Sequence, residues 1–217
     1  AMDIAGAYAS DWARERYAEA DLVIGFGLGL GHYTTESGYL FPGARVVQVD
    51  TNPRGLWQGL RTADLHVRAD ARATAEAILN RLQQRNIKIA GFRSKEIADG
   101  IAGDHPDRKD YPVQAGTVDP RRAMEELDRT IPKDWDIVVG GGHYLSIAMT
   151  HLKNRPADKY HVFVDFGAIG SALPAAIGAA LARGDGKVCL IEGDGSIMMH
   201  AQELDTIKRH GVRMLTA

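Results

Sequence analysis

The sequence has a single cysteine, no long apolar run and no large excess of charge of either sign. With Cys189 alone, neither a disulfide framework nor a cysteine-based zinc site can form within one chain, and we expect a reducing, cytoplasmic setting. No stretch approaches the roughly twenty apolar residues of a membrane span. The 26 Lys and Arg nearly balance the 28 Asp and Glu without a basic run, so neither nucleic acid nor a membrane is expected as a partner.

Apolar runs of strand length alternate with stretches of helical period, which is typical of βαβ units and a mainly parallel sheet. In the first half we predict helices over 11–20 and 71–84 and strands over 21–27, 45–49 and 65–68. In the second half we predict helices over 119–131, 171–183 and 196–210, and strands over 136–140, 161–165, 187–192 and from 212. The predicted fold class is α/β, with two Rossmann-like, mainly parallel three-layer segments.

Between these segments the periodicity is lost, and glycine, proline and charged residues crowd together. We therefore predict part of a nucleotide-binding-like domain over residues 1–86, a linker over 87–116 and the beginning of a second domain over 117–217.

The most informative segment is Gly193-Asp194-Gly195-Ser196, which follows a predicted buried strand. Glycines let backbone approach a bulky anion, and a helix with Ser196 as its N-cap would point free N–H groups at the same place. Asp194 would repel an anion there unless a cation lay between them, and Mg²⁺ accepts both carboxylate and phosphate oxygens. The segment thus predicts a magnesium-bridged phosphate site. For an isolated Gly-Asp-Gly, the alternative is an ordinary loop with Asp194 as a turn or cap residue.

The run from Ile191 to Gly211 resembles the cofactor motif of thiamine-diphosphate-dependent enzymes of the acetolactate synthase and pyruvate decarboxylase group. The resemblance implies that Asp194 is a ligand of Mg²⁺ and that Gly193, Gly195 and Ser196 contact thiamine diphosphate. In this family an asparagine further along the chain is the second protein ligand, which we expect beyond residue 217.

Two further segments agree with this resemblance. The stretch from Asp165 to Ser171 is similar to the family's Gly-x-(large apolar)-Gly segment, which implies that Ile169 wedges under the bent cofactor and that Gly167 and Ile169 pair with its aminopyrimidine ring. Taken alone, the segment reads more simply as a core isoleucine between turn-forming glycines. Gly140-Gly141-Gly142-His143 follows a strand and forms a second backbone-lined anion site. The resemblance implies cofactor contacts from Gly142, His143 and Tyr144, although His143 is equally well explained as a surface residue.

The first half contains a rival signal. Gly25, Gly27, Gly29 and Gly31 follow a strand, and Asp50 ends the next one, as in a dinucleotide-binding fingerprint. The glycines alternate, however, and the place of the third fingerprint glycine holds Leu30 or His32. The same stretch resembles the middle domain of thiamine-diphosphate enzymes, which holds FAD in acetolactate synthases and another nucleotide or nothing in several relatives. The arginine-bearing segment associated with FAD is not found, so the ligand of this domain is left open.

The resemblance implies a thiamine-diphosphate- and Mg²⁺-dependent lyase or transferase that acts on 2-oxo acids by decarboxylation and carbon–carbon ligation. We expect a fragment covering part of the middle domain and part of the diphosphate-binding domain. The family's catalytic glutamate belongs to another domain, so no catalytic residue is assigned here. We expect the chain to be inactive alone and the full-length protein to be a homodimer or homotetramer. The alternative is an NAD-dependent oxidoreductase or nucleotide-binding module that uses the loop at 25–31.

Overall fold

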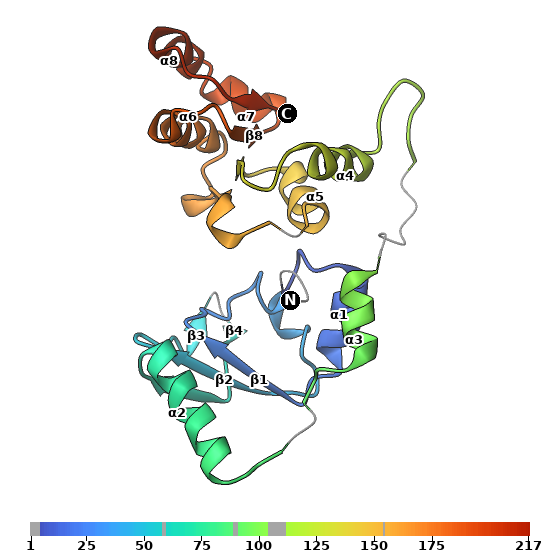
Figure 1. Cartoon of the computed structure of the whole chain (residues 1–217), viewed down its shortest axis with the longest axis vertical. Helices are drawn as coiled ribbons and strands as arrows, with labels where there is room; N and C mark the ends of the chain where they lie inside the picture. The colour runs from blue at the N-terminus through green and yellow to red at the C-terminus, as the bar shows by residue number, and fades with distance from the viewer. Residues whose placement is uncertain (1–4, 58–59, 89–90, 104–111, 154) are drawn as a thin grey trace. The chain divides into compact units, whose positions relative to one another are not determined.

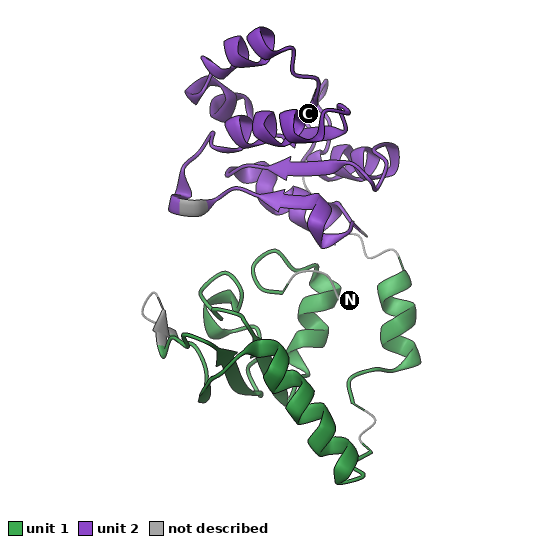
Figure 2. Ribbon diagram, turned by 60° about the vertical axis from the view of Figure 1, so that its left-hand side comes forward, with its two compact units in different colours: residues 1–109 green, residues 110–217 purple. Residues whose placement is uncertain are grey.

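The computed structural model describes residues 5–217 except 58–59, 89–90, 104–111 and 154 (Figure 1). The chain forms two compact units, Ala1–Lys109 and Asp110–Ala217, coloured green and purple in Figure 2. Each unit contains a parallel sheet. The predicted α/β class is therefore confirmed. No helix in the described part of the chain combines the length and apolar character needed to cross a membrane.

Unit 1 contains a three-stranded parallel sheet in the order β1-β2-β5 and a separate two-stranded antiparallel sheet, β3-β4. Its helices begin at capping side chains, since Ser10 accepts a hydrogen bond from Ala13 N and Asp70 accepts one from Ala73 N. In chain order the elements are α1 (Asp11–Ala18), β1 (Leu22–Phe26), η1 (Glu36–Gly38), β2 (Arg45–Asp50), β3 (Leu56–Trp57), β4 (Leu60–Arg61), β5 (Leu65–Arg68), α2 (Ala71–Gln84) and α3 (Lys95–Ala102).

Unit 2 contains a four-stranded parallel sheet in the order β7-β6-β8-β9. Its first helix has Asp119 as N-cap and Pro120 as first residue, a favourable start because proline lacks the N–H that is unpaired there. The elements are α4 (Pro120–Thr130), β6 (Asp136–Val139), α5 (His143–His151), η2 (Ala157–Lys159), β7 (Tyr160–Val162), η3 (Asp165–Gly167), α6 (Ala172–Arg183), β8 (Val188–Ile191), α7 (Asp194–Met199), α8 (Glu203–His210) and β9 (Leu215–Thr216).

The core of unit 2 lies around β6 and β8, in which every residue is buried. Val138, Val188 and Leu190 pack against the apolar face of α6, where Leu173 and Ile177 are the largest buried side chains. Successive residues of a strand point to opposite faces, so the other strand residues bury the second face of the sheet. The carboxyl ends of these strands are therefore rigidly supported.

The structure corrects one predicted helix and adds one within the predicted linker. The helix predicted over 196–210 is two helices, α7 and α8, and the N-cap is Gly193 rather than Ser196. At the break, His200 N–H bonds to Ile197 O at 3.1 Å, and Gly170, from another segment of the chain, lies close to Ser196 O. The predicted linker over 87–116 contains α3, an eight-residue helix that Ser94 caps; residues 89–90 and 104–111 of that linker lie outside the described residues.

Candidate functional site

The predicted cofactor segments leave neighbouring strands at one edge of the sheet in unit 2. β6 pairs directly with β8, and β7 flanks β6 on its other side. From β6 the chain runs through α5 to β7, whereas from β8 it runs through α7 and α8 to β9 in the opposite direction. The connections therefore diverge between the carboxyl ends of β6 and β8. This is the topological switch point at which open α/β sheets bind ligands.

Both helices that start at this switch point lack a side-chain cap. Gly142 is the N-cap of α5 and Gly193 is the N-cap of α7, and neither can supply a capping side chain. The N–H groups of a first helical turn have no partner within the helix, and they carry the positive end of its dipole. Two such turns on adjacent strands form a cradle that suits an anion with more than one charged group.

Asp194 is the first residue of α7 and is exposed at the carboxyl edge of the sheet. It takes part in none of the ion pairs found between described residues, so its carboxylate is available to a cation. Among the described residues, no group of three His, Cys, Asp or Glu side chains is arranged to hold a metal ion. The site therefore fits Mg²⁺ only if a ligand supplies oxygen atoms, as the phosphates of a nucleotide or diphosphate do.

Tyr144, in the first turn of α5, reaches across to β8. Its hydroxyl donates a hydrogen bond to Glu192 Oε1 and lies 3.1 Å from Gly141 O and 3.4 Å from Ser196 Oγ. The pKa of Tyr144 is raised to about 12, chiefly by burial and secondly by the hydrogen bond to Glu192. The phenol therefore keeps its proton at neutral pH and remains a hydrogen-bond donor. Sequence reasoning did not identify Glu192, because its partner Tyr144 lies 48 positions away in the chain.

Apart from Ser196, the other predicted site residues are exposed or partly exposed. His143 is exposed, and its carbonyl accepts a hydrogen bond from Ser146. Gly195 is exposed in α7, whereas Ser196 is buried with its hydroxyl 3.5 Å from Gly141 O. These assignments stay predictions, and the geometry adds that Ser196 faces the glycine turn after β6.

The segment after β7 packs against α7. Gly170 has a φ of +90°, and a Cβ placed there would lie 2.4 Å from His200 Nδ1 and 2.8 Å from Ser196 O. Gly167 also has a positive φ, of +65°. Ile169, between them, is 46% exposed and does not belong to the core. The structure thus brings the predicted apolar wedge next to the helix that carries Asp194.

The rival glycine loop in unit 1 is closed by its own protein atoms. Leu30 is 2% exposed, and its side chain lies 3.2 Å from the position of a Cβ on Gly25. Gln48 donates to the carbonyl oxygens of Leu28 and Gly29. In the described chain the loop leads into turns and the three-residue η1 and not into an α-helix. It therefore lacks the strand–turn–helix geometry of a dinucleotide fingerprint.

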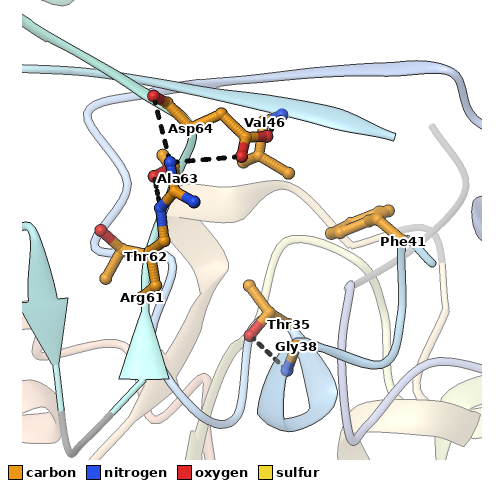
Figure 3. Close-up of a pocket in the computed structure, with 8 residues that line it drawn as sticks. All are labelled: Thr35, Gly38, Phe41, Val46, Arg61, Thr62, Ala63 and Asp64. Carbon is orange, nitrogen blue, oxygen red and sulfur yellow. Dashed lines mark hydrogen bonds and ion pairs between the residues drawn. The ribbon is translucent and has the colours of Figure 1, made fainter. Parts of the chain in front are cut away.

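Unit 1 also has an open pocket of about 100 Å³, shown in Figure 3, between η1, β2 and the turn after β4. Its polar side chains are already paired: Arg61 Nε donates to Ala63 O at 3.1 Å, and Thr35 Oγ1 accepts from Gly38 N. Cofactor and drug-sized sites occupy roughly 300–1,000 Å³. The pocket contains none of the predicted cofactor residues and is too small for a dinucleotide.

Comparisons with known proteins show what the chain is similar to. Residues 140–217 match the family model "Thiamine pyrophosphate enzyme, C-terminal TPP binding domain". The chain is 27% identical over 209 residues to the acetolactate synthase isozyme 2 large subunit of Escherichia coli, covering 96% of the chain and 36% of that protein. It is 29% identical over 219 residues to the sulfoacetaldehyde acetyltransferase of Rhodobacter capsulatus, covering 91% and 37%. The chain thus spans about a third of the length of these relatives.

The fold is shared with a solved structure from Mycobacterium smegmatis that is provisionally assigned as a thiamin diphosphate-dependent enzyme. The TM-score is 0.60 at 22% identity, covering 90% of this chain and 36% of that one. The resemblance predicted from the sequence is therefore confirmed: residues 140–217 match the family model of the C-terminal TPP binding domain, and most of the chain is similar to about a third of an acetolactate synthase large subunit.

Proposed function

We propose that unit 2 binds the diphosphate of thiamine diphosphate through Mg²⁺, as part of an enzyme that decarboxylates 2-oxo acids and ligates the product in the manner of acetolactate synthase. The observation that carries this proposal is the pair of uncapped glycine turns on adjacent strands with the exposed Asp194 beside them. The family match over residues 140–217 supports the identity of the cofactor.

Each part of the site would contribute separately. Backbone N–H groups at Gly142 and Gly193 would bind phosphate oxygens, and Asp194 would hold Mg²⁺ against them. Ile169 would support the cofactor from below, and the backbone at Gly167 and Ile169 would orient its ring. When bound, thiamine diphosphate supplies a carbon nucleophile and an electron sink for chemistry beside a carbonyl group. The family's catalytic glutamate comes from another domain, so we propose that this 217-residue chain alone forms no product from pyruvate.

Thermal unfolding of the purified chain tests the binding proposal. We expect thiamine diphosphate with Mg²⁺ to raise the melting temperature, by the equivalent of about 2.7 kcal/mol at a ligand concentration one hundred times Kd. Mg²⁺ alone should have little effect, because one carboxylate is a weak site. Asp194→Ala should abolish the ligand-induced shift, whereas Asp205→Ala, which removes an exposed carboxylate from α8, should preserve it.

The same measurement addresses the alternative function. Stabilisation by NAD without metal, unaffected by Asp194→Ala, would replace the thiamine proposal with the dinucleotide one. The filled loop around Leu30 leads us to expect no such stabilisation.

A further inference from the structure

A buried acid lies beside the proposed site and has only one of its oxygens bonded. Glu192 directly follows β8 and is 7% exposed. Oε1 accepts the hydrogen bond from Tyr144, whereas Oε2 is buried and has no hydrogen-bond partner among the described residues. An unsatisfied buried oxygen lowers the free energy of unfolding. A stabilising role alone therefore does not account for Glu192.

Three glycines lie close against the side chains of Glu192 and Tyr144, which form an acid–phenol pair. A Cβ at Gly140 would lie 2.4 Å from Glu192 Oε1 and 2.6 Å from Oε2. A Cβ added to Gly142 would lie 2.4 Å from the Tyr144 ring, and a Cβ added to Gly193 would lie 3.0 Å from it. The pair thus fills the space between the turn after β6 and the turn after β8. Real Cβ atoms do not approach other atoms closer than about 3 Å, so Gly140 and Gly142 must remain glycine while the pair is in place.

We propose that Tyr144 and Glu192 are positioning residues that tie the two glycine turns together and set the spacing between their phosphate-binding N–H groups. This inference rests on the proposed function but reassigns Tyr144, because a hydroxyl that donates to Glu192 is not donating to a phosphate. The hydroxyl is also in contact with Gly141 O and Ser196 Oγ, one on each side of the crevice. Loss of the pair should therefore loosen both turns and not only the one that carries the changed residue.

Amide hydrogen exchange of the cofactor-free chain tests the tie directly. In Tyr144→Phe and in Glu192→Ala, we expect exchange to accelerate about tenfold at Leu145 and Ile197, whose N–H groups bond to Gly142 O and Gly193 O, the value of one net hydrogen bond to a charged or buried group. Glu192→Gln keeps an acceptor for the phenol and should accelerate exchange much less. Tyr160→Phe is the matched control, since it removes a buried hydroxyl that has no partner among the described residues. Unchanged exchange in β6 and β8 shows that a variant is folded.

Binding of thiamine diphosphate with Mg²⁺ supplies the second readout. We expect each of Tyr144→Phe and Glu192→Ala to raise Kd about tenfold, and the double variant to raise it no further, since coupled residues are not additive. Additive effects on Kd, or exchange that changes at one turn only, would overturn the proposal. Weaker binding with unchanged exchange would also overturn it, because it assigns direct ligand contacts to these side chains. If the parent chain fails to bind the cofactor, the proposed function fails, while hydrogen exchange still decides whether the pair ties the turns.

Discussion

The two units use the same kind of parallel sheet but bury it to different extents. In unit 2 every residue of β6 and β8 is buried, and α6 covers one face with a continuous apolar surface. In unit 1 the described strand residues are mostly half-buried or exposed, and α2 contains no buried residue. The self-contained core of unit 2 gives its loops a firm base, which a site that must hold ligands at fixed distances requires.

The loops at the carboxyl edges of the two sheets also differ in how far protein side chains occupy them. After β1, Leu30 is buried and Gln48 donates to the carbonyl oxygens of Leu28 and Gly29, while Gly27 and Leu28 are exposed. After β8, Asp194 and Gly195 remain exposed beside an uncapped helix start. A parallel sheet therefore does not make a binding site by itself. The side chains that do or do not occupy the switch point decide whether one exists.

The largest effect that we expect is a difference in the free energy of unfolding between a strand substitution in unit 2 and one in unit 1. Leu190→Ala, at a fully buried position of β8, should lower the free energy of unfolding by about 3 kcal/mol through lost burial and a residual cavity. Leu65→Ala in β5, where the side chain is 55% exposed, should lower it by less than about 0.5 kcal/mol. Urea unfolding followed by circular dichroism measures both. Equal losses would show that the strands of unit 1 are as well packed as those of unit 2.

A smaller change in the free energy of unfolding is expected from a polar network at the start of β6 in unit 2. Asp136, at the start of β6, accepts a hydrogen bond from His161 at 2.8 Å and another from Arg183. Burial acts to raise the pKa of Asp136, but the hydrogen bonds from His161 and Arg183 outweigh it and the pKa is lowered. Asp136→Asn should lower the free energy of unfolding at pH 7 by about 2 kcal/mol, because it removes the carboxylate that pairs with Lys159 and Arg183 and leaves Arg183 with Asp185 alone. Asp99→Asn, at an exposed pair on α3, is the control and should change little.

The pH dependence follows from the sign of the shift. The ionised form of Asp136 is favoured in the folded chain, so its contribution is complete above the unfolded pKa of about 3.9 and is lost as the pH falls through the folded pKa. The stability difference between the parent chain and Asp136→Asn should therefore shrink as the pH falls below about 4. A difference that does not shrink below that pH would contradict the network.

The sequence predicted most strands and helices because apolar periodicity and capping residues are local signals. Asp70 and Asp119 mark the starts of α2 and α4, and Gly211 ends α8 with a φ of +60°. The interruption at His200 was missed, and it lies beside Gly170, a neighbour from another segment that a local pattern does not reveal. The bond between Tyr144 and Glu192 was missed for the same reason. Local pattern thus predicts which segments surround the site, whereas contacts across the crevice need the fold.

The last comparison concerns two glycines that both have positive φ near the carboxyl edges of the two sheets. Gly27 has a φ of +65°, and a Cβ added there would lie 3.8 Å from its nearest neighbour, so Gly27→Ala should cost only the backbone term of about 1 kcal/mol. Gly170→Ala has the same backbone cost. In addition, its Cβ would lie 2.8 Å from Ser196 O. We expect it to lower the free energy of unfolding by about 1 kcal/mol more than Gly27→Ala. The methyl can be accommodated only by moving α7, so Gly170→Ala should also weaken stabilisation by thiamine diphosphate with Mg²⁺, whereas Gly27→Ala should leave it unchanged. Equal effects of the two substitutions on ligand-induced stabilisation would mean that the segment after β7 does not support the helix that carries Asp194.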